Sequence, residues 1–178
     1  MRGYFAIGVE GISKPMNVGN LVRSAHAFGA SFVFTVAAHP KAGRAPSDTS
    51  KTHRQVPFYR WQSVEEMVLP SDCMLVGVEL LDEAVELPSF RHPAKAAYVF
   101  GPERGTLSPA MLERCSQTIK IPTAFCINVA TAGSIVMYDR ITSLGNFARR
   151  PTMTGQALEK VREHVSGGPR QRTKTSDA

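Results

Sequence analysis

Apolar runs solid enough to be buried strands alternate with helix-like segments along this chain. Runs rich in valine, phenylalanine, alanine and isoleucine, and one shorter run ended by a proline, predict strands at residues 4–10, 31–37, 73–80, 96–101 and 117–122. Periodicity or capping residues predict helices at residues 17–29, 63–69, 108–115, 127–148 and 154–165. The alternation predicts an α/β fold class, with a mostly parallel sheet flanked by helices on both faces.

Capping residues refine the bounds of these helices. Asn17 stands where an N-cap belongs, just after Pro15, and Gly29 stands where a C-cap belongs. Ser63 followed by Glu66 has the spacing of a capping box, and the pair Ser108-Pro109 is typical of a helix start. Residues 38–57 have no periodicity and predict a long loop, which is either functional or simply solvated.

Length and composition favour one globular domain. The chain has 178 residues, of which 43% are hydrophobic, and no apolar stretch approaches the length of a membrane helix. We therefore expect a domain over residues 1–150, followed by a C-terminal helix and basic tail over residues 151–178. The first residues resemble a strand more than a cleaved leader. Three cysteines without metal-ligand spacing suggest free thiols and a cytoplasmic protein without a membrane partner.

Positive charge is concentrated near the C-terminal end. The chain carries a net charge of +6, and from Arg149 onward seven basic and three acidic side chains give a local charge of +4. A basic tail attracts nucleic acid, but it can equally serve only solubility. The five histidines do not cluster at metal-ligand spacing, so we expect no metal site.

Three motifs carry the candidate chemistry. "NVGNLVR" spaces Asn17, Asn20 and Arg23 three apart, which stacks them along one helical stripe. "FGPERGTLS" places Glu103 in a glycine-containing loop at a strand end, and "IPTAFCINVATAGS" opens the longest helix at Asn128. Each motif alone has a structural reading as well, namely a helix cap, a tight turn and a core helix. In a parallel sheet, however, all three would meet at the carboxyl edge, where ligands bind.

The three motifs, in this order within one small α/β chain, resemble the SpoU/TrmH branch of the SPOUT methyltransferases, over residues 4–148. The resemblance implies S-adenosylmethionine as the methyl donor and RNA as the substrate. It implies ribose 2′-O-methylation, with tRNA favoured over rRNA because the chain has no added RNA-binding domain. It also implies a C-terminal trefoil knot and a homodimer in which a second subunit completes the site.

The resemblance transfers roles to particular residues. The residues that match the family's catalytic positions are Arg23, Asn17, Glu103 and Asn128. The residues expected at the donor are Val78, Glu79, Leu80, Gly101, Gly105, Ile121, Cys126, Ile127 and Ala130. A guanidinium rarely loses its proton, so we expect Arg23 to anchor the RNA rather than to act as a base, and we expect Glu103 to orient the stripe that carries it.

The basic loop after residue 38 is a candidate RNA contact. It carries Lys41, Arg44, Lys51, His53 and Arg54, and Asn20 on the helix stripe is expected to contact RNA as well. Cys126 departs from the family, which often has serine there. Two alternatives stay open: a non-catalytic RNA-binding protein with this fold, which Cys126 mildly favours, and an enzyme that methylates a base. The long helix at 127–148 suits either a dimer face or burial within one chain.

Overall fold

The computed structural model describes residues 3–43, 55–145, 147–159 and 161. In these residues seven strands, all paired in parallel, form one sheet in the order β3-β2-β1-β6-β4-β7-β5. The strands are β1 Tyr4–Glu10, β2 Phe32–Val36, β3 Phe58–Trp61, β4 Met74–Val78, β5 Val85–Glu86, β6 Lys95–Phe100 and β7 Gln117–Lys120. The helices are α1 Pro15–Ala27, α2 Pro109–Arg114 and α3 Val129–Leu144, with short 3-10 turns η1 Pro40–Gly43 and η3 Leu87–Ser89. The α/β class with a mostly parallel sheet is confirmed.

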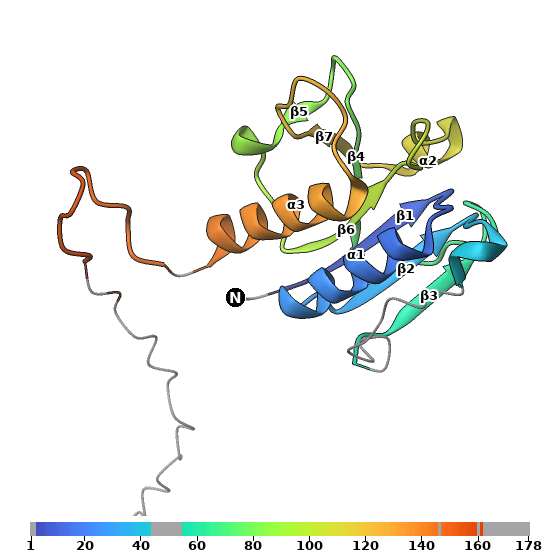
Figure 1. The fold of residues 1–178 in the computed structure, drawn as a ribbon, viewed down its shortest axis with the longest axis horizontal. Coiled ribbons are helices and arrows are strands. Elements are labelled where there is room, and N and C mark those ends of the chain that lie inside the picture. The colour runs from blue at the N-terminus through green and yellow to red at the C-terminus, as the bar shows by residue number, and fades with distance from the viewer. Residues whose placement is uncertain (1–2, 44–54, 146, 160, 162–178) are drawn as a thin grey trace, which may run out of the picture. The chain divides into compact units, whose positions relative to one another are not determined.

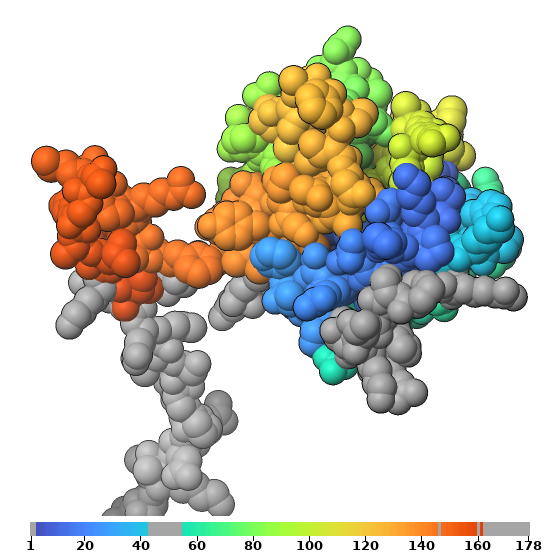
Figure 2. Space-filling model, viewed as in Figure 1, coloured from blue at the N-terminus to red at the C-terminus, as the bar shows by residue number. Residues whose placement is uncertain are grey.

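The sheet is covered on both faces. The helices α1 and α3 pack side by side over one face, as Figures 1 and 2 show in blue and orange. A Cβ added at Gly133 of α3 would lie 2.5 Å from Leu21 Cδ1 of α1, so glycine is what allows this close contact. A second buried cluster, which includes Met67, Leu107 and Met111, covers the opposite face. The strands β1, β2, β4 and β6 therefore have buried apolar side chains on both of their faces, which explains the solid apolar runs.

The first helix begins earlier than its sequence suggests. Lys14 is the N-cap residue and Pro15 the first helical residue, so the expectation of Asn17 as N-cap is wrong. Proline pre-sets the helical backbone and lacks only an N–H that would have no partner there. The predicted role of Gly29 at the helix end is confirmed: it follows the C-cap residue Phe28 with φ +74°, and the N–H of Ala30 donates to the carbonyl of Ala25.

The predicted helix at 63–69 is an irregular turn. The capping contacts do form, since the N–H of Glu66 donates to Ser63 Oγ (3.4 Å) and the Glu66 carboxylate accepts from the N–H of Gln62 (3.0 Å). The turn is held from outside as well, because Arg114, from α2, donates to the carbonyls of Val64 and Met67. A distant guanidinium thus supplies tertiary partners for this turn, which no local pattern reveals.

The chain divides into one unit at Met1–Gly145 and a second at Asn146–Ala178. In the second unit residues 154–159 form a turn and irregular structure rather than the start of the predicted helix at 154–165. The basic tail beyond it falls outside the described residues. Among the described residues no helix is both long and apolar enough to cross a bilayer.

The connections that follow the neighbouring strands β1 and β6 lead to opposite halves of the sheet. From β1 the chain continues through α1 to β2, whereas from β6, the neighbour of β1, it continues through α2 to β7 on the other half of the sheet. Connections that diverge in this way leave a crevice at the carboxyl ends of the strands. The trefoil knot implied by the resemblance stays a prediction.

Candidate active site

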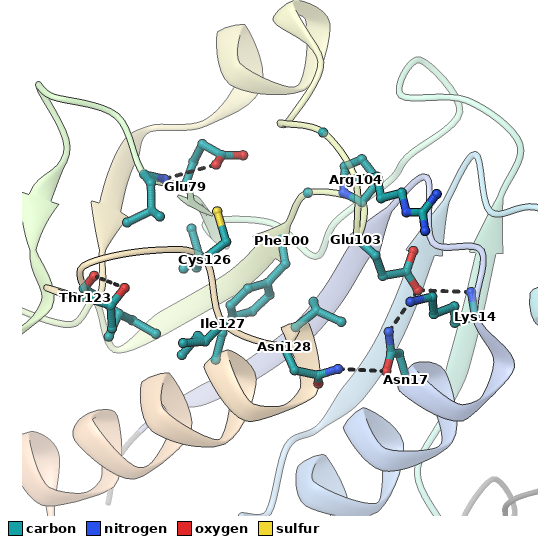
Figure 3. Close-up of a pocket in the computed structure, with 18 residues that line it drawn as sticks. Lys14, Asn17, Glu79, Phe100, Glu103, Arg104, Thr123, Cys126, Ile127 and Asn128 are labelled. Atoms are coloured by element: carbon teal, nitrogen blue, oxygen red, sulfur yellow. Dashed lines mark hydrogen bonds between the residues drawn. The ribbon is translucent and has the colours of Figure 1, made fainter.

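A cavity of about 520 Å³ opens at the carboxyl edge of the sheet (Figure 3). It lies beyond the ends of β4, β6 and β7 and beside the first turn of α1. The lining residues are Lys14, Asn17, Val78, Glu79, Leu80, Phe100, Gly101, Pro102, Glu103, Arg104, Gly105, Ile121, Thr123, Cys126, Ile127, Asn128, Val129 and Ala132. All three sequence motifs contribute residues to the lining of this cavity, although Asn17 and Asn128 are 111 residues apart in the sequence.

A chain of side-chain hydrogen bonds joins the three motifs. Asn128 Nδ2 donates to Asn17 Oδ1 (3.0 Å), and Asn17 Nδ2 donates to Glu103 Oε1 (3.0 Å), as the dashed lines in Figure 3 show. Asn17 is 6% exposed, so both of its bonds lie largely away from water. A buried amide with both ends satisfied fixes its own orientation and that of its neighbours.

The prediction that Asn128 opens the long helix is confirmed, because Asn128 is the N-cap residue of α3. Its Oδ1 accepts from the N–H groups of Ala130 (2.9 Å) and Thr131 (3.4 Å) at the start of α3. Because the oxygen caps the helix, the amide nitrogen must point to Asn17. One side chain therefore both begins α3 and connects it to α1.

Glu103 receives donors from the beginning of α1. Its carboxylate accepts from Ser13 N–H (3.1 Å), Ser13 Oγ (3.1 Å) and Lys14 N–H (3.0 Å), in addition to Asn17. Burial by itself raises the pKa of Glu103, but these hydrogen bonds outweigh it and hold the pKa below its ordinary value of 4.5. Glu103 is thus a carboxylate that organises the start of α1 and bonds Asn17, the first residue of the stripe that carries Arg23. That Glu103 orients Arg23 itself stays a prediction.

Two further carboxylates hold the loop after β6 by hydrogen bonds. Glu79 accepts from the N–H groups of Leu107 (2.9 Å) and Leu80 (3.0 Å), and Glu10 accepts from Ser108 N–H (2.8 Å) and Oγ (2.6 Å). A Cβ at Gly101 would lie 3.0 Å from both Glu79 Oε2 and Leu107 N. The fold of the loop itself therefore favours glycine at position 101, before any ligand is considered.

The cavity combines apolar walls with a polar rim. Phe100, Ile121, Ile127 and Val129 supply apolar surface, while Glu79 lies on the side opposite Glu103 in Figure 3. Such a cavity can hold a flat apolar ring while carboxylates and backbone groups bind polar ends. Among the described residues no group of three potential metal ligands lies together.

Comparison with known proteins identifies the family. Residues 4–138 match the model of the SpoU rRNA Methylase family. The chain belongs to this family. A curated relative is the mouse (Mus musculus) tRNA (guanosine(18)-2′-O)-methyltransferase TARBP1, 25% identical over 143 residues, which are 72% of this chain and 9% of the relative.

Solved structures share the SpoU fold of this chain. An AdoMet-bound rRNA methyltransferase from Sinorhizobium meliloti has a TM-score of 0.71 at 20% identity, over 81% of this chain and 58% of that one. The A. aeolicus TrmH/SpoU tRNA modifying enzyme has a TM-score of 0.69 at 19% identity, over 80% of this chain and 76% of that one. The chain thus spans a small part of TARBP1 and little more than half of the S. meliloti chain.

Eight of the nine residues expected at the donor line the cavity of this SpoU protein; Ala130 does not. Ala130 lies buried in the first turn of α3, where its N–H is held by Asn128. Of the four expected catalytic residues, Asn17, Glu103 and Asn128 line the cavity and Arg23 does not, because Arg23 lies exposed on α1.

Of the six residues expected to contact RNA, two are described, and neither lines the cavity. Asn20 is exposed on α1 and Lys41 is exposed on η1. Arg44, Lys51, His53 and Arg54 lie outside the described residues. Seven cavity residues were not predicted from the sequence: Lys14, Phe100, Pro102, Arg104, Thr123, Val129 and Ala132. Six of them lie within the quoted motifs, and Lys14 lies three residues before the first motif. Only Lys14 therefore needed a wider motif window.

Proposed function

We propose that this protein transfers a methyl group from S-adenosylmethionine to a ribose 2′-hydroxyl of RNA, with tRNA as the favoured substrate, and that it acts in the cytoplasm. The observation that carries the proposal is the hydrogen-bonded chain from Glu103 through Asn17 to Asn128, which brings all three SpoU motifs to one cavity. The relatives named for tRNA and 2′-O activity support the choice of substrate.

The cavity suits the proposed methyl donor. Its volume of about 520 Å³ lies in the range typical of cofactor sites, and its apolar walls can enclose an adenine ring. Glu79 and Glu103 provide negative charge for a donor that carries ammonium and sulfonium groups. When bound, S-adenosylmethionine would supply an electrophilic methyl group next to sulfur. The residues that would hold it are those that line the cavity around β4, β6 and the loop at 121–128.

Residues of this chain position the RNA relative to the methyl donor. Asn17 and Asn128 hold α1 and α3 at a fixed separation beside the cavity, so an RNA that rests on both helices meets the donor in one orientation. Lys14 and Arg104, at the cavity, provide positive charge for RNA phosphates. The proton of the 2′-hydroxyl leaves to water, because an arginine side chain stays protonated.

Arg23 anchors the RNA from outside the cavity. It is exposed on α1, where a guanidinium can bind a phosphate in a bidentate manner. We propose that a homodimer completes the site, so that RNA bound across two copies contacts Arg23 as well as the donor cavity. The helix α3 offers apolar surface for such a contact, since Ile135 is 37% and Tyr138 56% exposed.

A methyl-transfer assay tests the reaction. The protein is incubated with tritiated S-adenosylmethionine and with separate pools of tRNA and rRNA, and the product is digested with alkali. Ribose methylation leaves labelled dinucleotides, because the modified 2′-oxygen cannot cleave the chain. Label on mononucleotides instead would show base methylation, and no label on either pool would favour a non-catalytic RNA-binding protein.

Arg23→Ala tests the division of roles within this proposal. We expect methyl transfer to be lost while calorimetry finds donor affinity within about twofold of the original. Arg91→Ala, which removes another exposed arginine outside the site, is the matched control and should transfer methyl groups normally. Loss of donor binding in Arg23→Ala would contradict the assignment of Arg23 to the RNA.

A further inference from the structure

A second cavity of about 270 Å³ lies along β3 and at the carboxyl end of β2, next to the same edge of the sheet. It is separated from the donor cavity by the first turn of α1: Asn17 lines the first cavity, and the next residue, Val18, lines the second. Its other walls come from η1, from β3 and from residues 38–39 after β2. The proposed function makes no use of this cavity.

The chemistry of the second cavity is aromatic and cationic. The guanidinium of Arg60 lies over the ring of Phe58, with 4.3 Å from Arg60 Cζ to the ring centroid. His39 Nδ1 accepts from the N–H of Lys41 (3.3 Å), so Nε2 carries the proton and remains a donor. Gln62 adds an amide. Among the described residues that line the cavity, none carries a carboxylate. The cavity therefore favours an anionic partner with a flat ring.

The walls behind these groups are firmly packed. Trp61 stacks on Tyr59 with 5.8 Å between ring centroids and 7° between planes, and it contacts Phe34 at 5.5 Å. Phe34 is fully buried in the core. Trp61 thus packs toward the core on the opposite face of the sheet, while Arg60 and Phe58 lie together on this face of the edge strand β3. A guanidinium that already lies over a ring loses less entropy when a base stacks on it.

We propose that this second cavity binds one unpaired nucleotide of the RNA whose neighbouring ribose enters the donor cavity. The base stacks on the Arg60 guanidinium, and the phosphate is bound by Arg60 and His39. Unpaired RNA bases characteristically stack on arginine planes and aromatic rings. The cavity has about half the volume of the donor cavity, which suits a single nucleotide. This inference rests on the proposed function for the identity of the RNA.

The position of the cavity supports an RNA occupant over a free nucleotide. The two cavities are separated only by the first turn of α1, and the exposed surface of that helix carries Asn20 and Arg23. A single strand that crosses this turn can therefore reach both cavities. Such a strand would be fixed in register by the second cavity, which would select the nucleotide that is methylated.

Trp61 reports directly on this cavity, because it lines the cavity and is the only tryptophan of the chain. Single-stranded RNA tetranucleotides of each base are titrated into the full-length protein while its fluorescence is followed. We expect a saturable change with at least one tetranucleotide. Arg60→Ala should weaken that binding at least about tenfold and reduce the slope of log affinity against log salt by about one. Arg91→Ala, the same loss of charge at an exposed arginine elsewhere, should change neither.

Three results would overturn the proposal. The first is the absence of any fluorescence change, the second is equal affinity in Arg60→Ala, and the third is the same change with inorganic phosphate alone, which would indicate a simple anion site. Arg60 is exposed, so its loss should not unfold the protein. The titration needs no methyl donor. A protein that transfers no methyl group would therefore refute the proposed function while this measurement still decides the subsite.

Discussion

Asn17 is a single buried amide that joins the three motifs of the site. The sequence places it correctly in a functional motif, but it predicts a helix cap, and the structure instead makes it the bridge between Glu103 and Asn128. Local patterns register only neighbours within a turn or two, whereas these partners lie 86 and 111 residues away. The residue types were thus predictable from the sequence, and their partners were not.

The carboxylate of Glu103 provides the first prediction. Since its pKa is lowered in the folded protein, it stabilises the fold above its unfolded value of 4.5, and this stabilisation is lost as the pH falls through the folded pKa. We expect Glu103→Gln to lower the free energy of unfolding at neutral pH by about 1–3 kcal/mol, and by less in acid. Urea denaturation at several pH values measures this.

Glu113→Gln is the matched control for that change, because Glu113 is exposed on α2. Its stability should follow that of the original protein at every pH. If Glu103→Gln lost the same stability at pH 3 as at pH 7, the loss could not come from the carboxylate charge.

At the scale of elements, caps and close contacts decide where helices lie. The cap of α2 was predictable, since Ser108 accepts from the N–H of Met111 (3.1 Å), but its additional bonds to Glu10 were not. At 63–69 the capping contacts form without a helix, and Arg114, distant in sequence, bonds two carbonyls of the turn. Local capping signals therefore located the start of α2 but not that of α1, and they did not show whether a helix forms at 63–69.

The contact between α1 and α3 provides the second prediction. Gly133→Ala places a methyl group 2.5 Å from Leu21 Cδ1 and 3.2 Å from Ile7 Cδ1. Alanine favours a helix over glycine by about 1 kcal/mol, but overpacking a core costs typically about 1–3 kcal/mol. We expect a net loss of about 1 kcal/mol in thermal or urea unfolding. Thr131→Ala, on the exposed side of the same helix, should cost little, and an equally stable Gly133→Ala would show that the helices can separate freely.

At the scale of the whole molecule, a buried polar network ties the amino edge of the sheet to α3. Arg140 is fully buried and donates to the carbonyls of Pro93 (2.6 Å) and Ala94 (2.9 Å) and to Tyr98 Oη (3.1 Å). Tyr98 in turn donates to His92 Nδ1 (2.6 Å), and His92 Nε2 donates to Asp139 (2.8 Å). Burial raises the pKa of Tyr98 to about 12, so the phenol keeps its proton.

His92 in this network provides the third prediction. Burial lowers the pKa of His92 below 6.5 despite the opposing effect of Asp139, so the folded state holds it neutral. Stability is therefore present above the unfolded pKa and is lost as the pH falls below it, by at most about 1.4 kcal/mol per pH unit. His92→Gln should flatten the fall in melting temperature between pH 6.5 and 5. His26→Gln, at an exposed position of α1, should leave it unchanged.

The order of the strands explains how much of the whole molecule the sequence could predict. Alternating patterns predict the parallel α/β class, but they contain nothing about which strands are neighbours. The insertion of β6 between β1 and β4 brings the second motif beside the first, and the pairing of β7 with β4 brings the third. The parallel sheet predicts that the motifs lie at its carboxyl edge, but their contact within one site was expected only through the resemblance to SpoU proteins.

Calorimetric titration with S-adenosylmethionine tests the central claim most directly. Cys126→Trp puts a large side chain at the wall of the donor cavity, whereas Phe125→Trp alters the neighbouring residue, which is 77% exposed and does not line the cavity. We expect saturable binding by the original protein, similar binding by Phe125→Trp, and binding at least about tenfold weaker by Cys126→Trp. Binding of unchanged affinity in Cys126→Trp, or no binding by the original protein, would contradict the assignment of this cavity to the methyl donor.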